Sequence, residues 1–230
     1  MPSLRLVPSD GSHTTAQVTI RSTSDNALLE VRLLWSSLFL FLHAHTGIRV
    51  SNTPGAVDDA TATTALFLII SCLRHFAWGE RSAREGTWKV PISSARTHDI
   101  TGRTLGILGL GGIGLRLAHL VHAFPMRVIY YSRRKVAHAP EWCEYVGSMD
   151  ELLRQSDVLS LHVPLRPDTV HLVGEKEIRA MKKGSVIVNT ARGKVIDEEA
   201  MIRALEDGHV SGSFYIFIRR PCVINSGDFL

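Results

Sequence analysis

The sequence contains little cysteine, and the positions of its three thiols argue against two classes of protein. Cys72, Cys143 and Cys222 have no spacing typical of a metal site, and any disulfide scheme leaves one of them unpaired. A disulfide-stabilised secreted domain or a structural zinc module is therefore not expected. The first residues, MPSLRLVPSD, also lack the apolar stretch of a secretory signal. We expect a cytoplasmic protein.

Long apolar runs and concentrated charge are also missing. The run LLWSSLFLFL at 33–42 is too short to span a bilayer, so we expect a buried helix or strand there and no membrane partner. The net charge of +4 is spread along the chain apart from a short cluster at 133–135, so nucleic acid is not an expected partner. The composition, 45% hydrophobic and 21% charged, is that of an ordinary globular protein.

Strand and helix patterns alternate from about residue 103. The strand patterns lie at 103–110, 127–132, 158–164 and 185–190, and the helix patterns at 111–124, 149–155, 175–181 and 197–208. The strands are Val, Ile and Leu runs without clean alternation, which is typical of parallel strands covered on both faces. This order predicts an α/β fold with a Rossmann-type, doubly wound parallel sheet that binds ligands at the carboxyl ends of its strands.

The first half of the chain is less regular. Residues 1–27 are rich in Ser, Thr and Asp with weak periodicity, so we expect loop-like structure. GIRVSN at 47–52 has the pattern of a short strand. A single helix is predicted over about 59–79, apolar nearly all round, and such a helix is buried on several sides, as one between two domains would be.

A glycine turn follows the first strand of the alternating region and opens a helix. Gly109, Gly111 and Gly114 match G-x-G-x-x-G, with Gly112 and Ile113 between them. In this context the glycines allow a tight turn, close approach of the backbone to a pyrophosphate, and close packing of helix on strand. The alternative is a turn whose glycines serve packing alone. The motif predicts a dinucleotide site at the start of the helix.

The end of the next strand indicates which dinucleotide is preferred. Ser132 stands where folds that bind NAD usually carry an acid for the ribose 2′-hydroxyl, and Arg133 and Arg134 follow it. A hydroxyl and two guanidinium groups suit a 2′-phosphate, which a carboxylate would repel. The alternative is a solvated basic turn. We predict NADP(H) as the preferred cofactor, with NAD(H) as the second choice.

Arg192 marks the end of another strand. It follows SVIVNTA and precedes Gly193, at the edge of the sheet where ligands bind. Its planar guanidinium matches a carboxylate with two parallel hydrogen bonds. An arginine at a helix end or in a structural salt bridge is the alternative. We predict that Arg192 holds an anionic substrate.

Together these segments resemble the D-isomer-specific 2-hydroxyacid dehydrogenases, and the branch of glyoxylate and hydroxypyruvate reductases most. GLGGIG, HVPLRPDT and MKKGSVIVNTARGKVIDEEAMIRAL carry the resemblance, with SNTPGAVDDATATTALFLI and REGTWK upstream, so that it runs from about Gly47 to Gly212. The resemblance implies a dinucleotide-binding domain at 96–212 and, at 48–95, a truncated remnant of a flavodoxin-like substrate domain with the interdomain helix. Residues 1–47 and 213–230 match no part of the family.

The resemblance also implies a role for each matching position. The cofactor would touch Gly112, Ile113, Ser132, Arg133, Arg134, Val163, Pro164, Thr169, Thr190 and Ala191, with Thr61 near the nicotinamide. Arg192 would bind the carboxylate of a small 2-oxo acid and polarise its carbonyl group. Members of the family are usually dimers, so a homodimer formed through the cofactor domain is expected.

The chain departs from the family at both ends. The family places a glutamate and a histidine after the arginine, the histidine in a Pro-His-Ile/Thr-Gly segment, as an acid–base pair. No such segment occurs here, and the family's next strand, of the form G-L-D-V-F, with its nicotinamide-contacting aspartate, is not recognisable. No glycine lies between Ser12 and Thr46, where the family has a glycine-rich substrate loop. Exchange of both ends by a shifted reading frame or mis-joined exons is one hypothesis.

Two functions remain after these departures. The first is reduction of a small 2-oxo acid by NAD(P)H, impaired by loss of the acid–base pair, since His119, His122, His162 and His171 have the patterns of surface or packing residues. The second is a non-catalytic NAD(P)-binding sensor or partner-binding protein. SFYIFI at 213–218 is strand-forming and is predicted to stand in for the missing strand.

Overall fold

The computed structural model describes residues 5–6, 18–21, 28–31, 55–87 and 97–215, and the chain divides into the units Met1–Thr53 and Pro54–Leu230. In the first unit β1 (Arg5–Leu6), β2 (Val18–Arg21) and β3 (Leu28–Val31) form an antiparallel sheet in that order. The expectation of loop-like structure over 1–27 was therefore wrong for β1 and β2. The apolar run at 33–42 and GIRVSN lie outside the described residues.

The second unit contains the parallel sheet that the sequence predicts. Its strands are β4 (Thr104–Leu108), β5 (Arg127–Tyr131), β6 (Cys143–Tyr145), β7 (Val158–Leu161), β8 (Ser185–Asn189) and β9 (Val210–Tyr215). They lie in the order β6-β5-β4-β7-β8-β9, and every neighbouring pair is parallel. The chain winds outward from β4 in one direction and from β7 in the other, so the crevice between their carboxyl ends is the expected ligand site.

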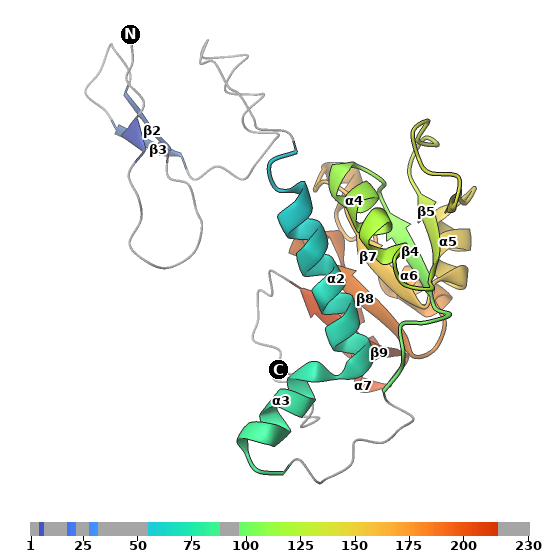
Figure 1. The fold of residues 1–230 in the computed structure, drawn as a ribbon. Helices are drawn as coiled ribbons and strands as arrows, with labels where there is room; N and C mark the ends of the chain where they lie inside the picture. The colour runs from blue at the N-terminus through green and yellow to red at the C-terminus, as the bar shows by residue number, and fades with distance from the viewer. Residues whose placement is uncertain (1–4, 7–17, 22–27, 32–54, 88–96, 216–230) are drawn as a thin grey trace. The chain divides into compact units, whose positions relative to one another are not determined.

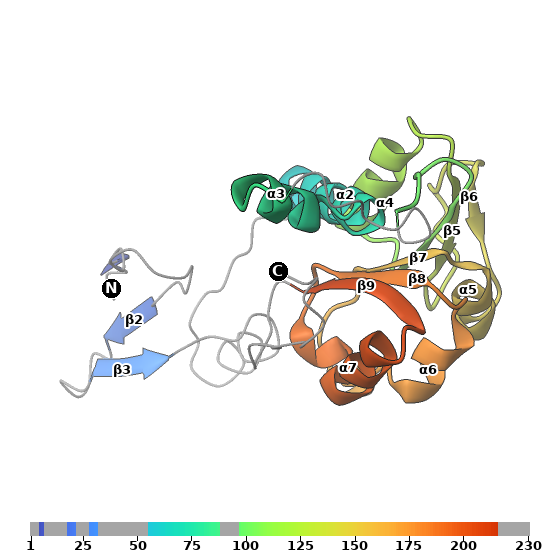
Figure 2. The ribbon, with the colours of Figure 1, turned by 90° about the horizontal axis from the view of Figure 1, so that it is seen from below.

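Helices cover both faces of this sheet (Figures 1 and 2). One face carries α2 (Asp58–Arg74) and α4 (Gly112–Val121), and the other carries α5 (Met149–Gln155), α6 (Glu175–Ala180) and α7 (Glu198–Glu206). Short 3₁₀ turns lie at η1 (Pro167–Thr169) and η2 (Gly193–Val195). The predicted Rossmann-type doubly wound sheet is confirmed.

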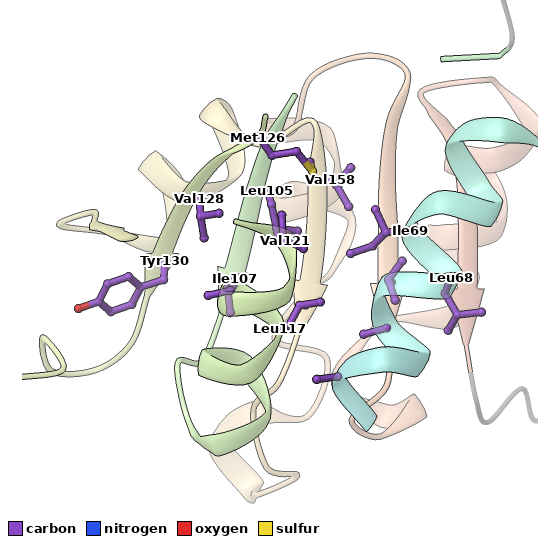
Figure 3. Close-up of a cluster of buried hydrophobic side chains, with 14 of the residues drawn as sticks. Leu68, Ile69, Leu105, Ile107, Leu117, Val121, Met126, Val128, Tyr130 and Val158 are labelled. Carbon is purple, nitrogen blue, oxygen red and sulfur yellow. The ribbon is translucent and has the colours of Figure 1, made fainter. Parts of the chain in front are cut away.

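Alternate strand residues divide the core between the two faces. Leu105 and Ile107 of β4 pack with Ile69 of α2 and Leu117 of α4 (Figure 3), whereas Leu108 belongs to the cluster on the other face. The strands β4, β7 and β8 are buried along their whole length, which explains the uninterrupted apolar runs in the sequence. The two buried layers hold the carboxyl ends of the strands in a fixed row.

The long helix predicted over 59–79 is instead two helices. α2 ends at Arg74, His75 takes a left-handed conformation with φ of 51°, and α3 (Phe76–Arg84) leaves at 69° to α2. The Leu73 carbonyl at the break accepts a hydrogen bond of 2.8 Å from the His98 N–H. The sequence predicts burial of this helix on several sides, but Phe67 on α2 is 60% exposed, so that side of the helix is not covered.

Two further strands, β6 and β9, flank the four strands of the predicted alternating region, and only β6 was not predicted. β6 has only three residues and pairs with β5, and β9 pairs with β8 in parallel. The predicted strand at SFYIFI is confirmed as far as Tyr215, but it begins earlier, at Val210, and 216–218 lie outside the described residues. The position beside β8 that was expected to be missing is therefore filled by β9.

Candidate functional site

The glycine turn lies between the ends of β4 and β7, and three of its glycines have different surroundings. Gly109 has φ of +96°, and a Cβ there would lie 3.0 Å from the His162 carbonyl oxygen. A Cβ at Gly114 would collide with the Gly109 carbonyl group. A Cβ at Gly111 would have nothing within 4 Å. Two glycines thus serve packing, and the third leaves the backbone open to an approaching group.

The start of α4 faces this open space. Gly111 is its N-cap residue and provides no side-chain acceptor for the first N–H groups of the helix. Unpaired N–H groups and the helix dipole favour an anion at this position. The Asp58 carboxylate lies against the α-carbon of Gly112, and its neighbour Asp59 forms an ion pair with Arg116. Residues from the start of α2 therefore border the turn.

Ser132 connects the end of β5 to the glycine turn. Its Oγ accepts a hydrogen bond of 2.9 Å from the Leu110 N–H. Among the described residues nothing accepts its hydroxyl proton, so that proton is free to be donated to a ligand. A hydroxyl both accepts and donates, whereas an ionised carboxylate only accepts.

A cavity of about 250 Å³ opens beside Ser132. Five of the predicted cofactor-binding residues line it, namely Ser132, Arg133, Val163, Pro164 and Thr169. The other lining residues were not predicted from the sequence, and they are Leu108, Tyr131, Met149, Arg166, Asp168 and Leu172. Arg134 is exposed and is not part of the lining. An apolar cavity with two guanidinium groups at its edge suits a ligand in which an anionic group lies close to an aromatic ring.

Thr169 determines the shape of the loop along this cavity. Its hydroxyl donates a hydrogen bond of 2.7 Å to the Pro164 carbonyl and accepts one of 2.7 Å from the Arg166 N–H. Both functions of the hydroxyl are thus used within the loop. Thr169 acts here as a loop brace that forms one wall of the cavity.

The turn after β8 presents Arg192 and is held by a buried amide that the sequence reading overlooked. Asn189 is 3% exposed. Its Nδ2 donates to the Arg192 carbonyl at 2.9 Å, and its Oδ1 accepts from the Ala191 N–H at 3.0 Å. Within the described part of the chain the exposed Arg192 guanidinium forms no ion pair, and it donates to the Ala191 carbonyl at 2.8 Å. This arrangement does not support the alternative of a structural salt bridge.

Thr190 carries a buried hydroxyl without a partner. The residue is 8% exposed, and its Oγ1 has no hydrogen-bond partner among the described residues. It shares its side of β8 with Val186 and Val188, which pack in the cluster with α2. Thr61 lies half-buried in the first turn of α2. A buried hydroxyl left unpaired is costly, so this atom fits a site that a polar ligand group completes.

Four histidines are predicted from the sequence to be surface or packing residues, namely His119, His122, His162 and His171. The Nε2 of His162 is 2.9 Å from the Ser160 Oγ, and burial lowers its pKa from 6.5 to about 4. His122 stacks on Trp142 with ring centroids 4.0 Å apart, and His119 meets the edge of the same ring. His171 is exposed and has φ of 51°. These contacts agree with packing and surface roles.

Metal and thiol chemistry find no support in the described residues. No group of three His, Cys, Asp or Glu side chains within them could hold a metal ion. Burial raises the pKa of the Cys72 thiol to about 12 and that of Cys143 to about 11, so both are protonated at neutral pH. Of the helices in the described ranges, none is by itself long and apolar enough to cross a bilayer. The bent pair α2 and α3 meets the criteria of length and composition when the two helices are taken together.

Comparison with known proteins agrees with this geometry. Residues 66–215 match the family model described as D-isomer specific 2-hydroxyacid dehydrogenase, NAD binding domain. The chain is 42% identical over 171 residues to a glyoxylate reductase of Korarchaeum cryptofilum. It is 44% identical over 178 residues to 4-methyl-2-oxopentanoate reductase A of Aspergillus oryzae. These matches cover 73% and 77% of this chain.

A solved structure gives the same result. The crystal structure of a glyoxylate reductase from Paecilomyes thermophila superposes with a TM-score of 0.71 and 46% sequence identity, over 76% of this chain and 52% of that one. The chain spans about half the length of the curated relatives it matches, 51% and 54% for the two named above. The family match runs from the middle of α2 to the end of β9 and includes the glycine turn, the cavity and the Arg192 turn. The chain therefore belongs to the D-isomer-specific 2-hydroxyacid dehydrogenase family.

Proposed function

We propose that this chain binds a reduced nicotinamide dinucleotide together with a small 2-oxo acid of the glyoxylate and hydroxypyruvate class, which is reduced to the 2-hydroxy acid. The observation that carries the proposal is the row of strand ends. Gly109 follows β4, Ser132 follows β5, Val163 follows β7 and Arg192 follows β8. Since the strands are parallel, these groups share one edge of the sheet.

The cofactor would extend along this edge. Its pyrophosphate would lie at the start of α4, on Gly111, Gly112 and Ile113, where the backbone is open at Gly111. Its adenosine would lie in the cavity beside Ser132 and Arg133. Its nicotinamide would reach Thr61, Thr190 and Ala191, where the unpartnered Thr190 hydroxyl gains a hydrogen bond. We propose NADP(H) as the preferred form and NAD(H) as a weaker ligand, because no acidic side chain follows β5 directly.

Arg192 would bind the substrate. When bound, the reduced nicotinamide supplies the hydride. The guanidinium of Arg192 would hold the carboxylate through two parallel hydrogen bonds and withdraw electrons from the adjacent carbonyl group. Asn189 would keep the backbone on both sides of this arginine fixed, which reduces the entropy lost when the substrate is oriented.

A group that could donate the proton to the carbonyl oxygen is not found among the residues that the structure describes. The half-buried His162 is neutral at pH 7 because of its low pKa. Within the described part of the chain, neither it nor His119, His122 or His171 is hydrogen-bonded to a carboxylate. Loss of a general acid costs about 10²–10⁴ in rate. We therefore propose that these 230 residues bind both ligands but turn over 2-oxo acids poorly.

A non-catalytic NAD(P)-binding sensor or partner-binding protein is the second candidate, and the same missing acid favours it. The two functions differ in what happens after the cofactor binds. An impaired reductase binds an oxo acid in addition and consumes NADPH slowly. A sensor binds the cofactor, shows no affinity for oxo acids and consumes no NADPH.

The test uses the purified 230-residue chain. Calorimetric titration with NADPH and NADH measures cofactor binding, and the loss of NADPH absorbance with glyoxylate, hydroxypyruvate or 4-methyl-2-oxopentanoate measures turnover. We expect cofactor binding with slow oxidation that depends on the oxo acid and disappears in Arg192→Ala. Turnover near the ~10 s⁻¹ of a typical enzyme would contradict the proposed lack of a general acid.

We also propose a homodimer formed through the cofactor domain. Phe67 on α2 and Phe76 on α3 are exposed at 60% and 49%, and large exposed aromatic side chains are common at subunit contacts. Light scattering coupled to gel filtration measures the mass directly. A mass of 25.4 kDa, that of one chain, would contradict a dimer.

A further inference from the structure

The cavity beside Ser132 has cationic groups from two different strand ends. Arg133 follows β5 and Arg166 lies in the loop after β7, and both line the cavity. We propose that Arg166, rather than Arg134, is the second guanidinium that binds the 2′-phosphate of the cofactor. This inference rests on the proposed cofactor site and names the residue that determines its specificity.

Sheet order explains why these two arginines meet at one cavity. β5 and β7 are the two neighbours of β4, so the loops that follow them flank the glycine turn from opposite sides. Arg134 is next to Arg133 in sequence, and all three arginines are exposed, but Arg134 lies outside the lining. A phosphate in this cavity would therefore be reached from both sides by Arg133 and Arg166, and Arg134 would act on it only through solvent.

The backbone of Arg166 is fixed. Its N–H donates to the Thr169 Oγ1 at 2.7 Å, and the same hydroxyl is bound to the Pro164 carbonyl. The side chain thus starts from a braced loop, so less conformational entropy is lost when it binds a phosphate.

The Arg166 guanidinium has no ion pair within the described part of the chain. By contrast, Arg154 on α5 pairs with Asp150, and Arg203 on α7 pairs with Glu175. An arginine that is not used in the fold keeps all of its donors for a ligand, and phosphate oxygens match them in bidentate geometry.

Ser132 completes an arrangement suited to an anion. Its Oγ already accepts from the Leu110 N–H, so what it offers to the cavity is its hydroxyl proton. Two guanidinium groups and one hydroxyl donor favour a phosphate over a neutral hydroxyl.

Asp168 is the opposing group. Among the described residues that line the cavity it is the one carboxylate. It would repel a phosphate but accept a hydrogen bond from a ribose 2′-hydroxyl. The cavity therefore holds one group that favours NAD(H) against three that favour NADP(H). We expect the three to dominate, and the variants below separate the two sets.

The experiment measures dissociation constants for NADPH and NADH with Arg166→Ala, Arg134→Ala and Asp168→Asn in the full chain. We expect Arg166→Ala to weaken NADPH by about tenfold or more and to leave NADH nearly unchanged. Arg134→Ala is the matched control, of equal charge change, and should alter the NADPH constant by less than about threefold. Asp168→Asn should strengthen NADPH.

Ligands without the nicotinamide test the 2′-phosphate contact by itself. 2′,5′-ADP carries the 2′-phosphate and 5′-AMP does not, so Arg166→Ala should lower the affinity of the first alone. The proposal is overturned if Arg134→Ala weakens NADPH more than Arg166→Ala does, or if Arg166→Ala weakens both cofactors equally. If the unmodified chain binds neither NADPH nor NADH, the proposed function itself fails, and that result is distinct from these.

Discussion

Two turns at the same edge of the sheet are built on opposite principles. The turn after β4 holds its shape because side chains are absent, with Gly114 packed where no Cβ fits and Gly109 in a tight position at φ of +96°. The turn after β8 holds its shape because one side chain is present, with the buried Asn189 amide bound to Ala191 and Arg192. The first leaves open backbone for a dinucleotide, and the second presents a cation. A substitution in one turn should therefore impair the binding of its own ligand and leave the other turn intact.

Adding a methyl group to the glycine turn should have the largest effect. In Gly114→Ala the new Cβ meets the Gly109 carbonyl, and we expect unfolding to become easier by about 3 kcal/mol. Chemical denaturation measures this loss. Gly111→Ala is the matched control, because its Cβ meets nothing within 4 Å, and it should keep its stability while binding NADPH more weakly. Equal destabilisation of both variants would contradict the division of roles.

Low pH should destabilise the protein near the glycine turn. The His162 carbonyl packs against Gly109, and burial lowers the pKa of its imidazole to about 4, below the ordinary 6.5. Between these values the unfolded chain binds the proton that the folded chain excludes. Stability should therefore fall as the pH drops from about 6.5 to 4, by at most about 3 kcal/mol. His162→Asn should lose this part of the pH dependence, and an unchanged slope would be evidence against it.

Removing the amide should damage the other turn alone. Asn189→Ala leaves the Ala191 N–H and the Arg192 carbonyl without this partner, which costs about 2 kcal/mol. We expect weaker binding of oxo acids and of oxalate, an unreactive carboxylate, with the NADPH affinity retained. Asn189→Asp keeps the acceptor for the Ala191 N–H but loses the donor to Arg192, so it is the finer variant. If NADPH and oxalate weakened in parallel, the turns would not be independent.

Substitution of Arg192 should weaken the binding of carboxylates with little effect on the stability of the protein. Arg192 is exposed and forms no ion pair within the described residues, so Arg192→Ala should unfold like the unmodified chain. Oxalate binding to the NADPH complex should weaken by about 1.5–3 kcal/mol, the usual value of a charge-assisted hydrogen bond. Arg192→Lys keeps the charge without the fork and should restore only part of this loss. Full restoration by lysine would exclude a bidentate contact.

The smallest effect is expected at Thr190. Thr190→Val removes a buried hydroxyl that has no partner in the described part of the chain while keeping the shape of the side chain. The free protein should become more stable by less than about 1 kcal/mol, and NADPH should bind more weakly. Thermal melts with and without NADPH measure both changes. A destabilised free protein would mean that the hydroxyl has a partner in the fold.

Much of this fold follows from local sequence patterns. The apolar runs from Leu105 onward predict parallel strands because each is buried on both faces, and the glycine spacing predicts the turn because Gly109 and Gly114 have sterically required roles. The break at His75 does not follow, since no glycine or proline marks it and the left-handed residue is a histidine. β6 is too short, at three residues, to give a pattern of its own.

The site shows a similar limit. Arg133 is predicted from its position after a strand, but Arg166 joins it only because β5 and β7 both border β4, an order that spacing along the chain does not reveal. Asn189 was overlooked because its amide bonds to the backbone of Ala191 and Arg192, a contact that depends on the conformation of the turn. Sequence patterns thus identify residues at strand ends, and the structure identifies the residues that hold them.

The central claim is that the site consists of two separable halves, a glycine turn for the cofactor and a braced arginine for the carboxylate. The most direct measurement is calorimetric titration of NADPH, and then of oxalate into the NADPH complex, with the unmodified chain and with Asn189→Asp. We predict that the variant binds NADPH like the unmodified chain but binds oxalate about tenfold or more weakly. Unchanged oxalate affinity in the variant, or absence of NADPH binding in the unmodified chain, would contradict the account.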